Sequence, residues 1–75
     1  MSHFVICLDN RSNPASLIVG KVYQRLPDAN AEARGMIRVI DEDASERDGY
    51  LYPSDLFAPI VVPEAVQRVL LAASS

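Results

Sequence analysis

The chain has 75 residues, of which 49% are hydrophobic and 23% charged. This is the composition of a single small globular domain and excludes a disordered or collagen-like chain. Ten acidic residues against seven basic ones give a net charge of −3, which disfavours nucleic-acid binding through a basic surface. Cys7 is the only cysteine, so no intramolecular disulfide forms, and we expect one cytoplasmic domain over residues 1–75 without cofactor or metal.

The first part of the chain predicts short strands separated by loops. Residues 4–8 are an apolar run typical of a buried strand, and the polar residues 9–14 predict a loop. Residues 17–26 carry apolar side chains on both sides of Gly20, which predicts two extended pieces joined at a bend or bulge. Residues 27–30 begin with a proline and break this strand.

The next part predicts an acidic hairpin. Residues 35–40 alternate, with Ile37 and Val39 on one face and Arg38 on the other, as in a strand. Residues 41–49 form the hairpin loop, and the aromatic strand that follows ends at Pro53, which cannot donate to a ladder. Residues 60–62 predict a last short strand.

A helix is predicted over residues 63–73, because a proline followed by a glutamate suits a first helical turn. Its apolar stripe consists of Val66, Val69, Leu70 and Ala73. We expect this stripe to close one mouth of the β structure, the alternative being a dimer or partner contact. The apolar run over residues 60–73 is too short and too polar to span a bilayer, so we expect no membrane association.

Five short strands, a long early loop and a terminal helix indicate a mainly β, partly open barrel. Residues 52–57, Tyr-Pro-Ser-Asp-Leu-Phe, resemble the last-strand signature of Src-homology-3 barrels, and residues 17–23 resemble the stretch after the first long loop of that family. Residues 6–10 stand where the opening strand would be. The whole resembles short bacterial proteins of this barrel class to which no clear activity is attached.

The resemblance first implies capture of proline-rich peptides in an aromatic groove. Leu8 and Asn10 stand where groove tyrosines are expected, Leu56 replaces a third tyrosine, and the chain has no tryptophan. Of the groove residues only Pro53 is retained. Polyproline binding is therefore disfavoured.

The aromatic strand leaves two registers open. The resemblance implies that Tyr52 faces inward and Leu51 outward, whereas hydrophobicity alone places Leu51 inside, and a slip of one residue exchanges the faces. We expect Tyr52 and Phe57 to pack in the core. Tyr50 is the best single candidate for an interface residue, because tyrosine joins a large apolar area to a polar tip.

The acidic loop is the predicted partner-binding surface for a basic protein of unknown identity. Its members are Asp41, Glu42, Asp43, Glu46 and Asp48. Complementary charge of this kind speeds encounter and weakens with salt. Asp41, Asp43 and Ser45 also have the first spacings of a calcium loop, but Glu46 stands where that loop needs glycine and Tyr52 where it needs glutamate, so a solvated hairpin tip is favoured.

We expect no enzyme activity. His3 is the only histidine, and Cys7 lies in an apolar run that suppresses thiolate formation, so acyl or phosphoryl transfer has no candidate machinery. The first alternative is a nucleic-acid or ribosome-associated barrel, which requires the scattered arginines to converge on one face. The second is a structural accessory subunit. A dimer through an edge strand or the C-terminal helix stays open.

Overall fold

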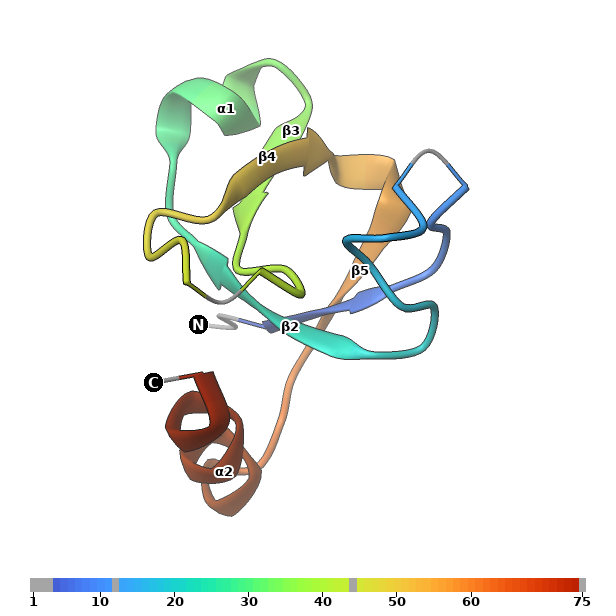
Figure 1. Ribbon diagram of the computed structural model, residues 1–75. Helices are drawn as coiled ribbons and strands as arrows, with labels where there is room; N and C mark the ends of the chain where they lie inside the picture. Colours follow the sequence, from blue (N-terminus) through green and yellow to red (C-terminus); the bar gives the residue numbers. More distant parts are fainter. Residues whose placement is uncertain (1–3, 12, 44, 75) are drawn as a thin grey trace.

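The computed structural model describes residues 4–11, 13–43 and 45–74. In chain order the elements are β1 (Phe4–Cys7), β2 (Val22–Leu26), α1 (Ala29–Ala33), β3 (Met36–Val39), β4 (Tyr50–Pro53), the 3-10 helix η1 (Ser54–Leu56), β5 (Phe57–Ile60) and α2 (Glu64–Ser74) (Figure 1). Neither α-helix has the length and apolar character needed to cross a lipid bilayer in the part of the chain described.

The strands form one open antiparallel sheet in the order β4-β3-β2-β1-β5. The expected mainly β fold with five strands and a C-terminal helix is confirmed at this level. In Figure 1 the sheet curls, so that its two edge strands, β4 and β5, are joined only by the short η1. The predicted end of the aromatic strand at Pro53 is confirmed.

Two of the predicted strand segments differ from the structure. The last strand was expected at residues 60–62, but the structure has it earlier, as β5, which begins at Phe57 and ends at Ile60. Residues 17–20 are turns and loop rather than an extended piece, and only β2 is a strand in that region. Leu17 is nevertheless fully buried, because its segment folds back over the core and is held by a bond from Leu17 N to the Asn13 oxygen.

Helix α1 was not predicted, although its start has a local signal. Asp28 caps the helix, since its side chain accepts a hydrogen bond from Ala31 N at 3.0 Å. A second, reciprocal hydrogen bond closes the cap, because the Glu32 carboxylate accepts from Asp28 N at 3.1 Å. Gly35, with φ of 74°, follows the helix and leads into β3. Capping therefore makes a single helical turn where Pro27 had indicated only a break.

The core lies on the concave face of the sheet and follows the predicted alternation. Tyr52 is buried and its ring meets that of Phe57 edge-on, with centroids 5.9 Å apart, while Leu51 is 44% exposed. This decides between the two registers of β4 in favour of the inward Tyr52. The core side chains are those of Val5, Cys7, Leu17, Tyr23, Ile37, Val39, Tyr52 and Phe57.

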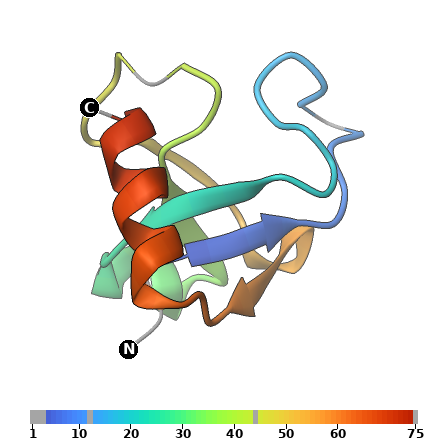
Figure 2. The ribbon, with the colours of Figure 1, turned by 90° about the horizontal axis from the view of Figure 1, so that it is seen from below.

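Helix α2 does not close a mouth of the sheet, contrary to the sequence-based expectation. Figure 1 shows it outside the curl of the sheet, on the side of β1 and β2, and in Figure 2 it lies over β2 and the start of β1. Phe4 is outside the core cluster and is still only 3% exposed. Alternation along β1 places it on the face opposite Val5 and Cys7, which is the side of α2. The linker of residues 61–63 explains the placement, because it reaches at most about 10 Å and β5 ends beside β1.

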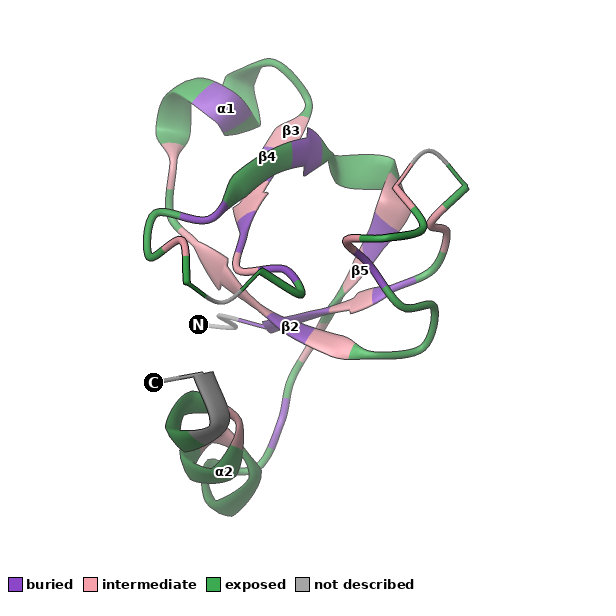
Figure 3. Ribbon diagram, in the orientation of Figure 1, coloured by how far each residue is buried: buried purple, intermediate pink, exposed green. Residues whose placement is uncertain are grey.

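The predicted apolar stripe of α2 is only partly buried over its described members, and the side chain of Ala73 lies outside the described residues. Leu70 is half-buried, but Val66 is 42% exposed and Val69 68% exposed. Figure 3 shows that most of the helix is exposed. The Gln67 side chain donates to the Val62 oxygen at 3.0 Å and fixes the first turn to the linker.

Candidate partner-binding site

The acidic loop between β3 and β4 has a shape set by short-range hydrogen bonds. Asp43 N donates to Asp41 Oδ1 at 2.8 Å, and Gly49 N donates to the Glu46 oxygen at 3.2 Å. Gly49 has φ of 65°, and a Cβ at this position would lie 2.5 Å from the Val39 oxygen. Only glycine fits this close approach, so the end of the loop is fixed where it enters β4.

Asp41 is the one buried charged side chain among the residues described. Its two carboxylate oxygens accept from Asp43 N and from the Tyr52 hydroxyl. Burial, and next the bond to Asp41, raise the pKa of Tyr52 to about 12. The hydroxyl therefore stays protonated and donates to Asp41 at neutral pH.

Asp43 and Tyr50 form a second, more exposed pair beside the first. The Tyr50 hydroxyl donates to Asp43 Oδ2 at 2.9 Å, and Ser45 Oγ donates to Asp43 Oδ1 at 2.5 Å. The bonds from Ser45 and then Tyr50 lower the pKa of the Asp43 carboxyl, and the bond to Asp43 raises the pKa of Tyr50. Asp43 thus carries a negative charge at the surface.

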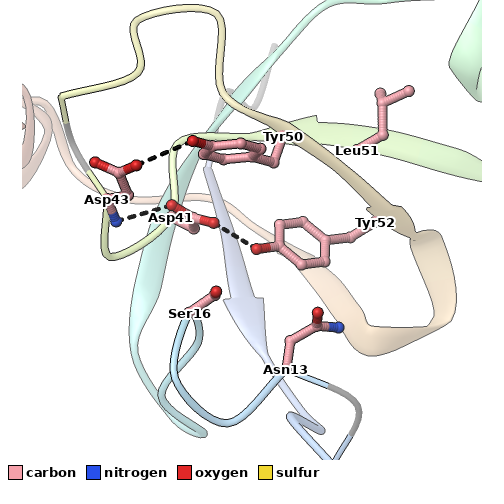
Figure 4. A pocket seen from close by; sticks show the side chains of 7 residues that line it. All are labelled: Asn13, Ser16, Asp41, Asp43, Tyr50, Leu51 and Tyr52. Carbon is pink, nitrogen blue, oxygen red and sulfur yellow. Dashed lines mark hydrogen bonds between the residues drawn. The ribbon is translucent and has the colours of Figure 1, made fainter.

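A pocket of about 410 Å³ lies beside these two pairs. In Figure 4 Asp41 lies between Asp43 and Tyr52, and Asn13 and Ser16 face them from the β1–β2 loop. A bond from Glu42 N to the Ser16 oxygen at 3.0 Å ties the two loops together. The lining residues are Asn13, Ser16, Asp41, Asp43, Tyr50, Leu51 and Tyr52.

The structure brings together three of the predicted partner-binding residues, Asp41, Asp43 and Tyr50, at this pocket. Glu42, Glu46, Asp48 and Pro53 are not among its lining residues. Glu46 accepts a bond from Asp48 N at 3.1 Å in the far part of the loop, and Pro53 is exposed at the end of β4.

Glu42 is occupied by a structural contact. Its carboxylate accepts from Lys21 Nζ at 2.6 Å and from the Tyr23 hydroxyl at 2.5 Å. These bonds, from Lys21 first, lower the pKa of Glu42, while burial and then the bond to Glu42 raise the pKa of Tyr23. The Tyr23 hydroxyl also accepts from Ile18 N at 2.8 Å. Glu42 therefore holds the β1–β2 loop in place.

Sequence reasoning missed Asn13 and Ser16 as pocket residues, because they meet the acidic loop only through folding of distant segments. Sequence reasoning assigned Tyr52 to the core, and Tyr52 is buried there. Tyr52 also lines the pocket, where its hydroxyl donates a hydrogen bond to Asp41. His3 lies outside the described residues. Cys7 is buried as expected, and burial raises the pKa of its thiol.

The ion pairs of the described residues leave most of the acids without a basic partner in the acidic loop. Five acids have a basic partner, in the pairs Asp9–Arg11, Glu42–Lys21, Glu32–Arg25, Asp28–Arg38 and Glu64–Arg68. The acids without such a partner in this part of the chain are Asp41, Asp43, Glu46, Asp48 and Asp55. All but Asp55 belong to the acidic loop.

No group of three or more His, Cys, Asp or Glu residues suited to a metal ion is found in residues 4–11, 13–43 and 45–74. Compared with models of protein families, with curated proteins and with solved structures, the chain matches none.

Proposed function

We propose that this protein is a non-catalytic protein-interaction module on a Src-homology-3-like barrel, and that its acidic loop binds a basic segment of a protein partner. The observation that carries the proposal is the group of acids without basic partners in the acidic loop, two of which, Asp41 and Asp43, line a pocket together with Tyr50. Within the described residues neither Asp41 nor Asp43 has a cationic partner.

The barrel class is supported by topology. The antiparallel sheet has the order β4-β3-β2-β1-β5, and only a 3-10 helix separates its two edge strands along the chain, which fits a partly open barrel. Residues 52–57, which resemble the last-strand signature of the class, contain this 3-10 helix together with the end of β4 and the start of β5.

A basic partner is supported by chemistry. A negatively charged concave surface attracts a cation, and a buried carboxylate gains when a cation neutralises it. Tyr50 adds an exposed ring face, over which an arginine or lysine is favourable. Pre-formed hydrogen bonds hold both carboxylates, so binding requires little reordering of the loop.

The alternative of a nucleic-acid or ribosome-associated barrel has less support. Five of the seven basic side chains are in ion pairs with acids. Arg25 and Arg38, which lie on adjacent strands, pair with Glu32 and Asp28 of the α1 region. A phosphate backbone would have to displace these carboxylates before it met a basic patch.

The test is capture of partners from native extract by the immobilised protein at low salt and at about 1 M salt, where the Debye length falls to roughly 3 Å. The control is the matched neutral variant Asp43→Asn, Glu46→Gln, Asp48→Asn, whose substitutions lie on the exposed loop. We expect a basic protein to be retained only by the parent and to elute at high salt. A partner retained equally by the variant and at high salt would contradict the proposal.

A further inference from the structure

The two edge strands of the sheet differ in what their free edges offer. Ser54 N donates to the Gly35 oxygen at 2.9 Å, one step beyond the pair of Pro53 and Met36. Hydrogen-bonded and non-hydrogen-bonded pairs alternate along an antiparallel ladder. Leu51 and Pro53 are therefore in non-hydrogen-bonded positions against β3, and their backbone groups point to the free edge of β4.

The same argument assigns the free edge of β5. Leu8 N donates to the Leu56 oxygen at 2.8 Å, one step beyond the pair of Cys7 and Phe57, so Phe57 and Pro59 point away from β1. Phe57 N donates to the Ser54 oxygen, and Pro59 has no N–H. Pro53 likewise has none. Within β4 and β5, Leu51 is thus the one outward-pointing residue whose N–H is available.

The pocket lies along this edge of β4. Successive side chains of a strand point to opposite faces, so Tyr50 and Tyr52 share one face and Leu51 is on the other. A pocket lined by all three consecutive residues therefore follows the strand's edge rather than one face. Across from it stand Asn13 and Ser16 of the β1–β2 loop (Figure 4).

We infer that an extended basic segment of the partner binds by antiparallel strand addition to β4, through two hydrogen bonds with the N–H and C=O of Leu51. This inference rests on the proposed function and specifies its binding mode. The partner residue opposite Leu51 shares the Leu51 face, and the residues on either side of it share the face of Tyr50 and Tyr52. Those flanking residues carry the cations, because Asp43 and Asp41 accept from the hydroxyls of the two tyrosines.

Charge complementarity selects this occupant over a second copy of the chain. The edge presents the carboxylates of Asp41 and Asp43, which form no ion pair with a described basic residue, and the copy would bring the same carboxylates to the contact. Like charges facing each other oppose pairing. Pro53 limits the added strand to a short segment, because it removes the next outward donor.

The test uses the pentapeptide acetyl-Thr-Arg-Val-Arg-Thr-amide in titrations followed by the NMR shifts of backbone amides. One matched peptide carries an N-methyl group on the central valine, which removes the N–H that would bond to the Leu51 oxygen. The control peptide carries the N-methyl group on the first arginine, whose N–H points away from β4. We expect the valine derivative to bind roughly three- to tenfold more weakly and the arginine derivative to bind like the parent.

Two protein variants test the same bond from the other side. Leu51→Pro removes the outward N–H without breaking a bond to β3, as Pro53 already does two positions on. We expect it to weaken binding of the parent peptide by a similar factor. Leu51→Ala keeps the N–H and is expected to bind nearly as the parent does. Asp43→Asn is expected to weaken binding of all three peptides.

Equal binding of the two N-methylated peptides would overturn strand addition, and a loss with Asp43→Asn in that case would still support the proposed function. Binding of no peptide at millimolar concentration would also overturn strand addition, whereas the proposed function would be judged by the salt-sensitive capture of a basic partner. If Leu51→Pro does not fold, the two N-methylated peptides still decide the matter.

Discussion

Asp41 lies at the boundary between the core and the candidate site. The residue is 6% exposed, and its carboxylate accepts hydrogen bonds from the Tyr52 hydroxyl and from Asp43 N. A buried carboxylate without hydrogen-bond donors is costly, so Tyr52 supports the acidic loop as well as filling the core. The same tyrosine thereby links the stability of the sheet to the charge of the pocket.

The Tyr52 hydroxyl is expected to contribute measurably to stability. Tyr52→Phe keeps the ring against Phe57 but leaves one oxygen of Asp41 without its donor, which is expected to lower the free energy of unfolding by about 1–3 kcal/mol. Urea unfolding followed by circular dichroism measures the change. Tyr50→Phe is the matched control, because the Tyr50 hydroxyl bonds to the exposed Asp43 and its loss should barely move the midpoint. Equal effects of the two variants would contradict this role of Asp41.

The buried tyrosines also predict loss of stability in alkaline solution. The folded chain raises the pKa of Tyr52 to about 12, against about 10 in an unfolded chain, so folding favours the protonated phenol. This contribution is complete below about pH 10 and is lost as the pH rises through about 12. Urea unfolding at successive pH values, with phenolate absorbance as a second signal, should show the decline. Tyr52→Phe should make the decline shallower, and an unchanged slope in that variant would contradict the assignment.

The strands were more predictable than the loops at the level of single elements. Alternation identified β3 and the inward Ile37 and Val39, because burial of one face imposes a period of two residues. Residues 17–20 were predicted to be extended because they begin with apolar residues, but they form a loop from which Leu17 enters the core. This loop is held by hydrogen bonds from Ile18 N to the Tyr23 hydroxyl and from Leu17 N to the Asn13 oxygen. Helix α1 depends on the cap at Asp28, a signal weaker than the proline before it.

Helix α2 makes a prediction at the scale of an element, because its two neighbouring apolar residues differ in exposure. Leu70 is half-buried, and Leu70→Ala is expected to cost about 1 kcal/mol of unfolding free energy through lost apolar burial. Val69 is 68% exposed, and Val69→Ala is expected to be neutral or stabilising by a few tenths of a kcal/mol, since alanine is the better helix former. Thermal unfolding of both variants measures the contrast. A larger loss with Val69→Ala would place the Val69 side of α2 against the sheet.

The whole molecule shows which features a sequence can specify. Strand number and the C-terminal helix follow from local patterns, so they were predicted. The side of the sheet that α2 covers depends on where β5 ends, and the pocket depends on contact between Ser16 and Glu42, which are far apart in the chain. Asp41, Asp43 and Tyr50 were identified from their loop and strand, and they meet through hydrogen bonds within that hairpin. Asn13 and Ser16 reach the same pocket only because the β1–β2 loop folds against it.

Each edge strand carries a proline, Pro53 in β4 and Pro59 in β5, which implies that the fold limits edge-to-edge pairing between the sheets of two molecules. Pro59 has no N–H on the outward side of β5, which is a common way to protect an edge from other chains. Pro59→Val restores an outward donor with a strand-forming side chain while the bonds of Ala58 to β1 are kept. We expect this variant to self-associate, seen as an increase in sedimentation coefficient with concentration. Pro59→Lys restores the same donor but charges the edge, and should sediment as the parent does. If Pro59→Val also sediments as the parent, another part of the molecule protects β5, and the proline has no part in keeping chains apart.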